Sequence, residues 1–245
     1  NRGRCAQPCR RLYNNKYVLS TKDLCLLPKL PEVISTGTFS LKIEGRLRSP
    51  LYVATVARIY RKYIDIAYDN LIKNASMKNF DHIYSTEEKD LDDLTIAFNR
   101  EFTTGFAFNN SIVDSRMPMN RGLFIGVIND GKIKLKKDLK VGDGVSIWVE
   151  DEINKNKAQT HGNTIEYIKV TNYNGTIGEN ETNHAKKDDI VEINLIKSKE
   201  GSAVYKTSSV DLVVDLGEEI SFQNTKDISL PEIKHDIKSV ENKDQ

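Results

Sequence analysis

Long apolar runs are missing from this sequence, and cysteines are few. No stretch approaches the roughly 18 apolar residues of a transmembrane helix, and no basic segment followed by an apolar one marks a secretory leader. All three cysteines lie within the first 25 residues, which excludes a full disulfide framework and favours a cytoplasmic protein. The missing initiator methionine is expected of a piece of a longer protein or of a mature form.

Familiar peptidase motifs are also absent. The sequence has no His-Glu-x-x-His metal site and no Gly-x-Ser-x-Gly nucleophile motif. A cysteine protease needs a base beside its thiol, and no histidine lies within 50 residues of Cys25. The four histidines are scattered through the later part of the chain: His82, His161, His184 and His235. The sequence alone therefore offers no visible machinery for peptide hydrolysis.

Charge is balanced in total but not along the chain. The net charge is +1, yet residues 1–73 hold 14 Lys and Arg against 5 Asp and Glu, whereas the remainder holds 22 against 30. A basic N-terminal third predicts a polyanion or an anionic substrate at that end, unless it is only a solvated basic face. The one basic run in the acidic part, residues 132–140, is read as lysines that protect a strand edge, in preference to a nucleic-acid surface.

Periodicity predicts an α/β segment first. A short strand is expected at residues 17–19, and residues 39–43 alternate apolar and polar side chains, which predicts a second strand. Ser49 and Pro50 then predict the start of a long amphipathic helix over residues 50–72. A second helix is expected to start at a capping box formed by Ser85 and Glu88.

The pattern changes after Met117. Six or seven short β-branched runs separated by Gly, Asn and Asp predict a small β-barrel or sandwich. The chain is therefore divided into an α/β part over residues 1–116, an all-β extension over 117–223, and a disordered tail over 224–245.

Several short sequence motifs of the first part occur in the same order as in one known protein family. "NRGRCAQPCR", "STKDLC", "SLKIEGRLRSPLYVATVARIYR" and "FNREFTTGFAF" resemble the collagenase-like peptidases, peptidase family U32. The resemblance is strong over residues 1–125 and weak afterwards. It implies the C-terminal part of an incomplete TIM-like barrel followed by a small β-barrel domain, because two βα units cannot close an eight-stranded barrel. One departure is Glu101, since the family usually has a glycine there, and a permissive backbone is expected at that position.

The cysteines are the first candidate site. Cys5 and Cys9 have a usable chelate spacing, and Cys25 could fold back to them to hold zinc or an iron–sulfur cluster; three ordinary thiols are the alternative. The resemblance implies more, because RNA- and quinone-hydroxylating members bind a four-iron four-sulfur cluster through four cysteines. It then makes Cys5, Cys9 and Cys25 the cluster ligands, and the fourth ligand is not in this chain.

The "KIEGR" word is the second candidate site. At the C-terminal end of a barrel strand, Lys42, Glu44 and Arg46 are expected to form a catalytic pocket, with Arg46 gripping an anion; a structural Lys42–Glu44 ion pair is the alternative. The resemblance implies prephenate, a dicarboxylate, as the oxygen donor. Further substrate contacts are expected from Arg10, Arg11, Arg48, Tyr52 and Arg61.

These patterns and the resemblance predict an iron–sulfur-dependent, oxygen-independent hydroxylase that modifies RNA. A tRNA is favoured over an rRNA as the substrate, no membrane contact is expected, and the oligomeric state is left open. Two other functions are kept: a collagenase-like peptidase, which is the traditional label of the family, and a non-catalytic RNA-binding fragment.

Overall fold

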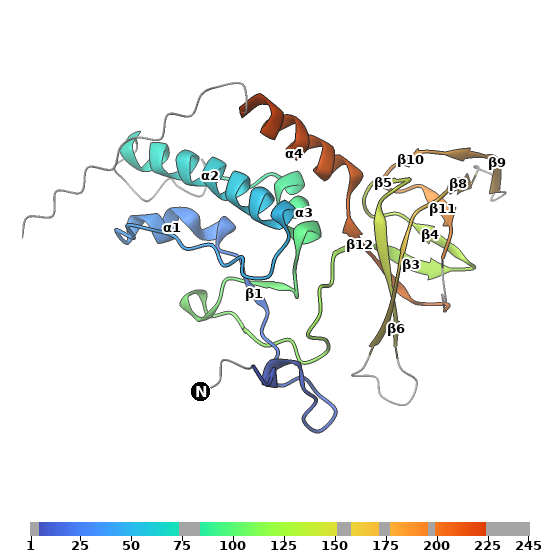
Figure 1. Ribbon diagram of the computed structural model, residues 1–245, viewed down its shortest axis with the longest axis horizontal. Coiled ribbons are helices and arrows are strands. Elements are labelled where there is room, and N and C mark those ends of the chain that lie inside the picture. The colour runs from blue at the N-terminus through green and yellow to red at the C-terminus, as the bar shows by residue number, and fades with distance from the viewer. Residues whose placement is uncertain (1–4, 74–83, 151–157, 172–176, 196–198, 224–245) are drawn as a thin grey trace, which may run out of the picture.

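A helical part and a curled sheet stand side by side in the computed structural model (Figure 1). The structure describes residues 5–73, 84–150, 158–171, 177–195 and 199–223. The predicted disordered tail, residues 224–245, lies outside these ranges. No helix within them is both long and apolar enough to cross a bilayer.

The helical part is built around one long helix. The 24-residue helix α2 spans Pro50–Lys73 and confirms the predicted start, because the Tyr52 backbone N–H donates to the Ser49 hydroxyl at 3.2 Å. Two-residue strands β1 and β2 pair in parallel, with Asp23 opposite Phe102. The elements of this part are η1 (Pro8–Arg10), β1 (Asp23–Leu24), η2 (Leu27–Lys29), α1 (Leu30–Ser35), α2, α3 (Glu88–Ala97), β2 (Phe102–Thr103) and η4 (Phe106–Phe108).

Helices α1, α2 and α3 enclose the first core. Its buried members include Leu27, Leu30, Ile59 and Tyr63. Tyr63 also connects two helices, because its hydroxyl donates to Asp90 at 2.9 Å and accepts the Glu87 backbone N–H at 2.7 Å. These bonds hold the first residues of α3 in place. The Tyr63 hydroxyl of α2 thus accepts a backbone N–H at the start of α3, which a local N-cap side chain would otherwise do.

Three local predictions for this part are wrong. Residues 17–19 form a turn and not a strand, and residues 39–43 have no strand partner among the described residues. The alternation at 39–43 is real, but a strand also needs a neighbouring edge for its backbone hydrogen bonds, and Phe39 is fully exposed. Helix α3 has Glu87 as its N-cap residue, with no side-chain cap, so the Ser85–Glu88 capping box does not form.

The strands predicted after Met117 are present, although the part predicted to be all-β also ends in a helix. Eight strands form one curled antiparallel sheet in the order β7-β6-β12-β3-β4-β11-β8-β9, with β7 and β9 at its edges, and β5 and β10 form a separate pair (Figure 1). The curl encloses a core of aliphatic side chains such as Ile125, Ile147 and Val204. The strands are β3 (Leu123–Asn129), β4 (Lys132–Lys134), β5 (Leu139–Lys140), β6 (Gly144–Glu150), β7 (Ala158–Thr164), β8 (Ile168–Thr171), β9 (Ile177–Thr182), β10 (His184–Ala185), β11 (Ile190–Ile193) and β12 (Ala203–Ser208).

Helix α4 (Val210–Gln223) was not predicted, and it joins the two parts. Leu212 and Leu216 of α4 pack with Ile96 of α3 in a small buried cluster. Its valines resemble a strand in the sequence, and only packing against α2 and α3 selects the helix.

The basic run 132–140 also serves this junction. Lys137 pairs with Asp92 at 2.6 Å and also with Glu88, and Lys140 pairs with Asp211 at 2.7 Å. Two lysines of the run are therefore held by acidic side chains of α3 and α4.

Candidate functional site

A cavity of about 330 Å³ opens in the helical part, between β1, β2, α2, the end of α3 and the loop over residues 41–48. It gathers the three residues of the "KIEGR" word that the sequence selected, Lys42, Glu44 and Arg46. Arg48 and Tyr52 also line it. The catalytic role of these side chains stays a prediction, but the structure does bring them together around one space.

The Lys42–Glu44 pair is not the structural ion pair that was considered as the alternative to a catalytic pocket. Both side chains are largely exposed, at 87% and 72%, and the Nζ and Oε2 atoms are 3.9 Å apart. The Glu44 carboxylate instead accepts the Arg46 backbone N–H at 2.9 Å, and the Glu44 carbonyl accepts the Tyr52 hydroxyl at 3.2 Å. These bonds attach the loop to the first turn of α2 and hold Arg46 at the cavity mouth.

Arg48 and Arg100 are positioned by aromatic and acidic neighbours. The Arg48 guanidinium carbon lies 3.4 Å from the centre of the Phe98 ring, which is a close cation–π stack. Arg100 forms a charge-assisted pair with Asp23, with Nη2 and Oδ1 2.5 Å apart. The hydrogen bonds that Arg100 donates to the Asp23 carboxylate raise the pKa of Arg100 above its usual value, so this guanidinium stays charged.

Cys25 and Tyr60 form part of the cavity floor. The Tyr60 hydroxyl accepts the Leu26 backbone N–H at 3.1 Å and donates to Cys25 Sγ at 3.7 Å. Burial raises the pKa of the Cys25 thiol, and burial with the neighbouring Cys25 raises the pKa of Tyr60. Both groups are therefore neutral near pH 7 and make the floor less polar than the mouth.

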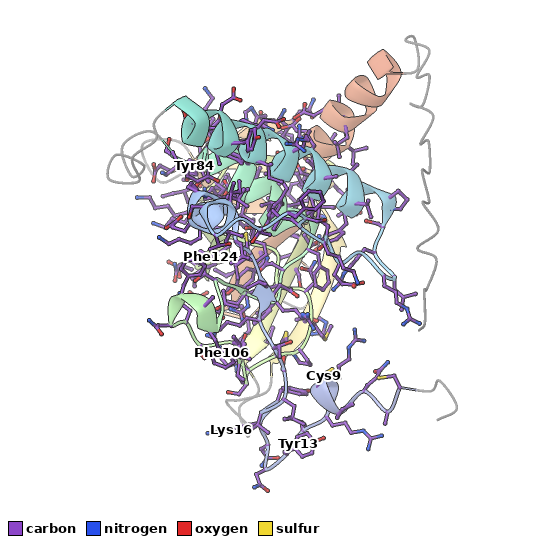
Figure 2. All side chains as sticks on the ribbon, turned by 90° about the vertical axis from the view of Figure 1, so that its left-hand side faces the viewer. Cys9, Tyr13, Lys16, Tyr84, Phe106 and Phe124 are labelled. Atoms are coloured by element: carbon purple, nitrogen blue, oxygen red, sulfur yellow. The ribbon has the colours of Figure 1, made fainter. Side chains whose placement is uncertain are left out.

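The three cysteines are not gathered into a metal site. Cys5 is exposed, Cys9 is half-buried and Cys25 is buried. Within the described residues, no three Cys, His, Asp or Glu side chains could hold one metal ion together. Figure 2 shows Cys9 beside the turn of Tyr13 and Lys16, at the opposite end of the view from Tyr84, which packs in the core that contains Cys25. The three thiols therefore do not converge on one metal ion within the described residues, and their role as cluster ligands stays a prediction.

The remaining predicted substrate contacts lie away from the cavity. Arg10 and Arg11 are exposed at η1, and neither lines the cavity. Arg61 points along the exposed face of α2, where it forms an ion pair with Asp65. Only Arg48 and Tyr52 of that set are therefore placed at the cavity.

Three residues of the site were missed: Asp23, Phe98 and Arg100. Phe98 and Arg100 do belong to the "FNREF" word that carries the resemblance. Asp23 and Arg100 are 77 residues apart in the sequence, however, and only the parallel pairing of β1 with β2 brings them together.

Glu101 confirms the expected permissive backbone. Its φ is +77°, in the region that favours glycine. Its carboxylate is bound by three cations, with Lys22 at 3.0 Å, Arg116 at 2.8 Å and Arg121 at 2.6 Å. Partial burial acts to raise the pKa of Glu101, but the hydrogen bonds from Lys22 and Arg121 outweigh it and hold the pKa below its usual range.

The first part of the chain is similar to proteins of one known family. Residues 1–116 match peptidase family U32. A collagenase of Porphyromonas gingivalis is 33% identical over 117 residues, which are 43% of this chain and 30% of that protein. The tRNA hydroxylation protein P1 of Bacillus subtilis is 37% identical over 123 residues, which are 43% of this chain and 27% of that protein.

A third relative extends the similarity further along the chain. The 23S rRNA 5-hydroxycytidine synthase of Escherichia coli is 29% identical over 186 residues, which are 65% of this chain and 27% of that protein. The chain thus spans 30% or less of the length of these three relatives. No solved structure matches it.

Proposed function

Since residues 1–116 belong to peptidase family U32, we propose that this chain is part of a protein that hydroxylates RNA, with a tRNA favoured over an rRNA. Two relatives of the chain are named for hydroxylation of tRNA and of rRNA. The observation that carries the proposal is the cluster of cationic side chains at the cavity mouth.

The charge of the cavity suits an anionic ligand. Lys42, Arg46, Arg48 and Arg100 line it, against only two carboxylates, Asp23 and Glu44. Asp23 is already neutralised by Arg100. The excess positive charge therefore comes from Lys42, Arg46 and Arg48, and guanidinium groups bind carboxylate or phosphate oxygens through paired hydrogen bonds.

The oxygen donor that we propose is a small dicarboxylate of the prephenate type. A cavity of about 330 Å³ is near the lower end of the range for small-molecule sites. Arg46 and Arg48 would bind its carboxylates, while the floor at Cys25 and Tyr60 would receive its less polar part. The RNA would approach at the mouth, where the Lys42 side chain is 87% exposed and only loosely paired with Glu44, so that it could meet a phosphate.

A four-iron four-sulfur cluster stays a prediction and carries no step of this proposal. The arrangement of Cys5, Cys9 and Cys25 does not support a shared centre. Iron content and visible absorption of the longer protein, purified without oxygen, test the cluster directly.

The peptidase alternative finds little support in the described geometry. Burial raises the pKa of Cys25, whereas a thiol nucleophile needs a lowered one. The side chain that hydrogen bonds to Cys25 is the Tyr60 hydroxyl, which is not a base near neutral pH. The case for a peptidase therefore rests on names: that of the family and those of relatives such as the collagenase of Porphyromonas gingivalis.

A gene deletion with complementation tests the proposal. Nucleosides from tRNA and rRNA of the deletion strain are compared by mass spectrometry with those of strains carrying the full-length protein, wild type or variant. We expect a hydroxylated nucleoside to disappear on deletion and to return with the wild-type protein and with Arg61→Ala, which lies outside the cavity. Arg46→Ala and Arg48→Ala should restore little of it. Unchanged nucleosides in the deletion strain would refute the proposal.

A further inference from the structure

Three aromatic side chains lie on neighbouring strands of the curled sheet. Phe124 of β3 and Tyr205 of β12 have ring centres 5.5 Å apart, and Tyr205 and Trp148 of β6 have ring centres 4.9 Å apart. We call this set, Phe124, Tyr205 and Trp148, the aromatic platform.

The platform faces away from the sheet core. Tyr205 is opposite Phe124 on one side and Ser146 on the other. Successive side chains of a strand point to opposite faces. The neighbours of the platform residues along their strands, Ile125, Val204 and Ile147, are fully buried in the core, so the aromatic rings are on the outer face.

Small residues surround the platform and leave its rings accessible. Ser146 is paired with Tyr205 and Gly162, and Ala203 is paired with Trp148. Phe124 is 39% exposed, while Tyr205 and Trp148 are half-buried. An aromatic surface kept at the outer face of a sheet, beside small side chains, has the shape of a site for flat ligands.

Cations border the platform. The Arg121 guanidinium carbon is 5.2 Å from the centre of the Trp148 ring. Arg116 is 62% exposed; its Nε and Nη2 bind Asp114 and Glu101, and its Nη1 has no partner within the described ranges. Together with Lys22, these arginines give three positive charges against the two carboxylates of the group.

One donor on the platform lacks a partner. The Trp148 indole N–H is buried and makes no hydrogen bond to any described residue. Because this atom is shielded from solvent, it is not a contact for a ligand on the platform, and the inference rests on the rings and the bordering cations.

We infer that the aromatic platform binds a single-stranded segment of RNA by base stacking, with Arg116 contacting its backbone phosphate. Stacked aromatic side chains next to cations are the usual means of holding single-stranded nucleic acid. A double helix would not fit, because its bases are already stacked. This inference rests on the proposed function only in taking RNA as the substrate.

The platform is connected to the cavity by two consecutive residues. Arg100 lines the cavity, and Glu101 binds Arg116 and Arg121 beside the platform. A strand of RNA held on the platform therefore lies next to the wall of the cavity, which would present a nearby nucleotide to its mouth.

Trp148 makes the test direct, because it is the only tryptophan of the chain. A short single-stranded oligouridylate, labelled at one end, is titrated into the protein, and fluorescence anisotropy reports binding while tryptophan emission reports contact at the platform. We expect binding to quench tryptophan emission, and an RNA duplex of the same length to bind less tightly. Binding without a change in tryptophan emission would overturn the inference.

Variants separate stacking from charge. Loss of one stacked base contact weakens binding about fivefold or more, so Tyr205→Ala and Phe124→Ala should do so, while Tyr205→Phe should bind like the wild type. Arg116→Gln should reduce the dependence of affinity on salt by about one phosphate contact, whereas Lys136→Gln, which removes an exposed charge from the bend between β4 and β5, should not. Circular dichroism confirms that each variant is folded.

The outcomes distinguish this inference from the proposed function. If the aromatic variants bind the oligonucleotide with the affinity of the wild type, or if the wild type does not bind it, the inference that the platform binds RNA is refuted. The nucleoside assay with the cavity variants then decides the proposed function by itself. The inference would also be overturned by a second protein that binds at the platform and that RNA does not displace.

Discussion

The Asp23 carboxylate accepts three kinds of hydrogen bond from one residue, Arg100: from its backbone N–H at 2.8 Å, from Nε at 3.2 Å and from Nη2 at 2.5 Å. The pair closes one wall of the cavity where β1 meets β2. Because Arg100 directs its backbone N–H, Nε and Nη2 to Asp23, it serves the structure of the wall and leaves ligand binding to Arg46 and Arg48.

Replacing Asp23 tests this division of roles. Asp23→Ala leaves a half-buried arginine without its partner, so the free energy of unfolding should fall by about 1.5–3 kcal/mol. Urea denaturation measures the change. Asp65→Ala, which removes an exposed ion pair with Arg61, should cost less than about 1 kcal/mol. Equal effects of the two variants would show that the Asp23–Arg100 pair is no more important than a surface contact.

Asp143 provides a second stability prediction, at the junction of the sheet with α4. Its carboxylate binds Lys206 Nζ at 2.8 Å and the Val210 backbone N–H at 3.0 Å, and both side chains of the ion pair are buried. Asp143→Ala leaves an unpaired buried lysine, so we expect a loss of about 3–5 kcal/mol. Asp211→Ala breaks only the exposed pair with Lys140 and should change the stability little. If Asp143→Ala lowers the thermal midpoint only slightly, the buried Asp143–Lys206 pair does not have the importance for stability that we predict.

The backbone at Glu101 allows a comparison of two substitutions that both remove the carboxylate. Glu101→Gly suits a φ of +77°, whereas Glu101→Ala keeps the strained conformation. The glycine variant should therefore be more stable than the alanine variant by about 1 kcal/mol. Chemical denaturation of the two variants side by side gives this difference. A more stable alanine variant would rule out a positive φ at this position.

The lowered pKa of Glu101 makes a prediction about acid stability. A carboxylate whose folded pKa is depressed stabilises the protein above its unfolded pKa, and loses that contribution as the pH falls through the folded value. The stability gap between wild type and Glu101→Gln should therefore be full at pH 7 and shrink as the pH falls below about 4.5. Thermal melts over this range measure it. A gap that widens on acidification would refute the assigned role of Lys22 and Arg121.

The sequence predicted the residues of the 42–48 loop at the cavity better than the opposite wall formed by Asp23 and Arg100. Lys42, Glu44 and Arg46 are neighbours in one short word, and they do line one cavity with Arg48 and Tyr52. The Asp23–Arg100 wall depends on a parallel pairing across 77 residues, which no local pattern encodes. The long helix α2 was predictable for the opposite reason, because its cap and its apolar stripe are both local.

The errors in the fold have the same origin. Residues 39–43 alternate as a strand does, but no neighbouring edge is present to complete it within the described residues. Helix α4 looks like a strand in its composition, and its packing on Ile96 decides otherwise. Both outcomes depend on partners distant in the sequence, which overrule local propensity.

The cysteines yield the last prediction, because their three environments differ. The thiolate is the reactive form of cysteine, and burial both raises the pKa of Cys25 and blocks access to it. Under native conditions iodoacetamide should therefore modify the exposed Cys5 first, the half-buried Cys9 next and Cys25 last, as followed by peptide mass spectrometry. In urea the three rates should become similar, which controls for local sequence effects.

The same experiment decides how Cys25 relates to a metal centre. A cysteine that ligates iron must be a thiolate and must be able to meet the other ligands. If Cys25 reacts as fast as Cys5 without denaturant, the packed floor formed with Tyr60 is not maintained in solution, and a shared site with Cys5 and Cys9 becomes available again. If Cys25 stays protected in protein shown to be free of iron, the Tyr60 hydroxyl and the surrounding core hold this sulfur in place, and ligation by Cys25 would require that packing to open.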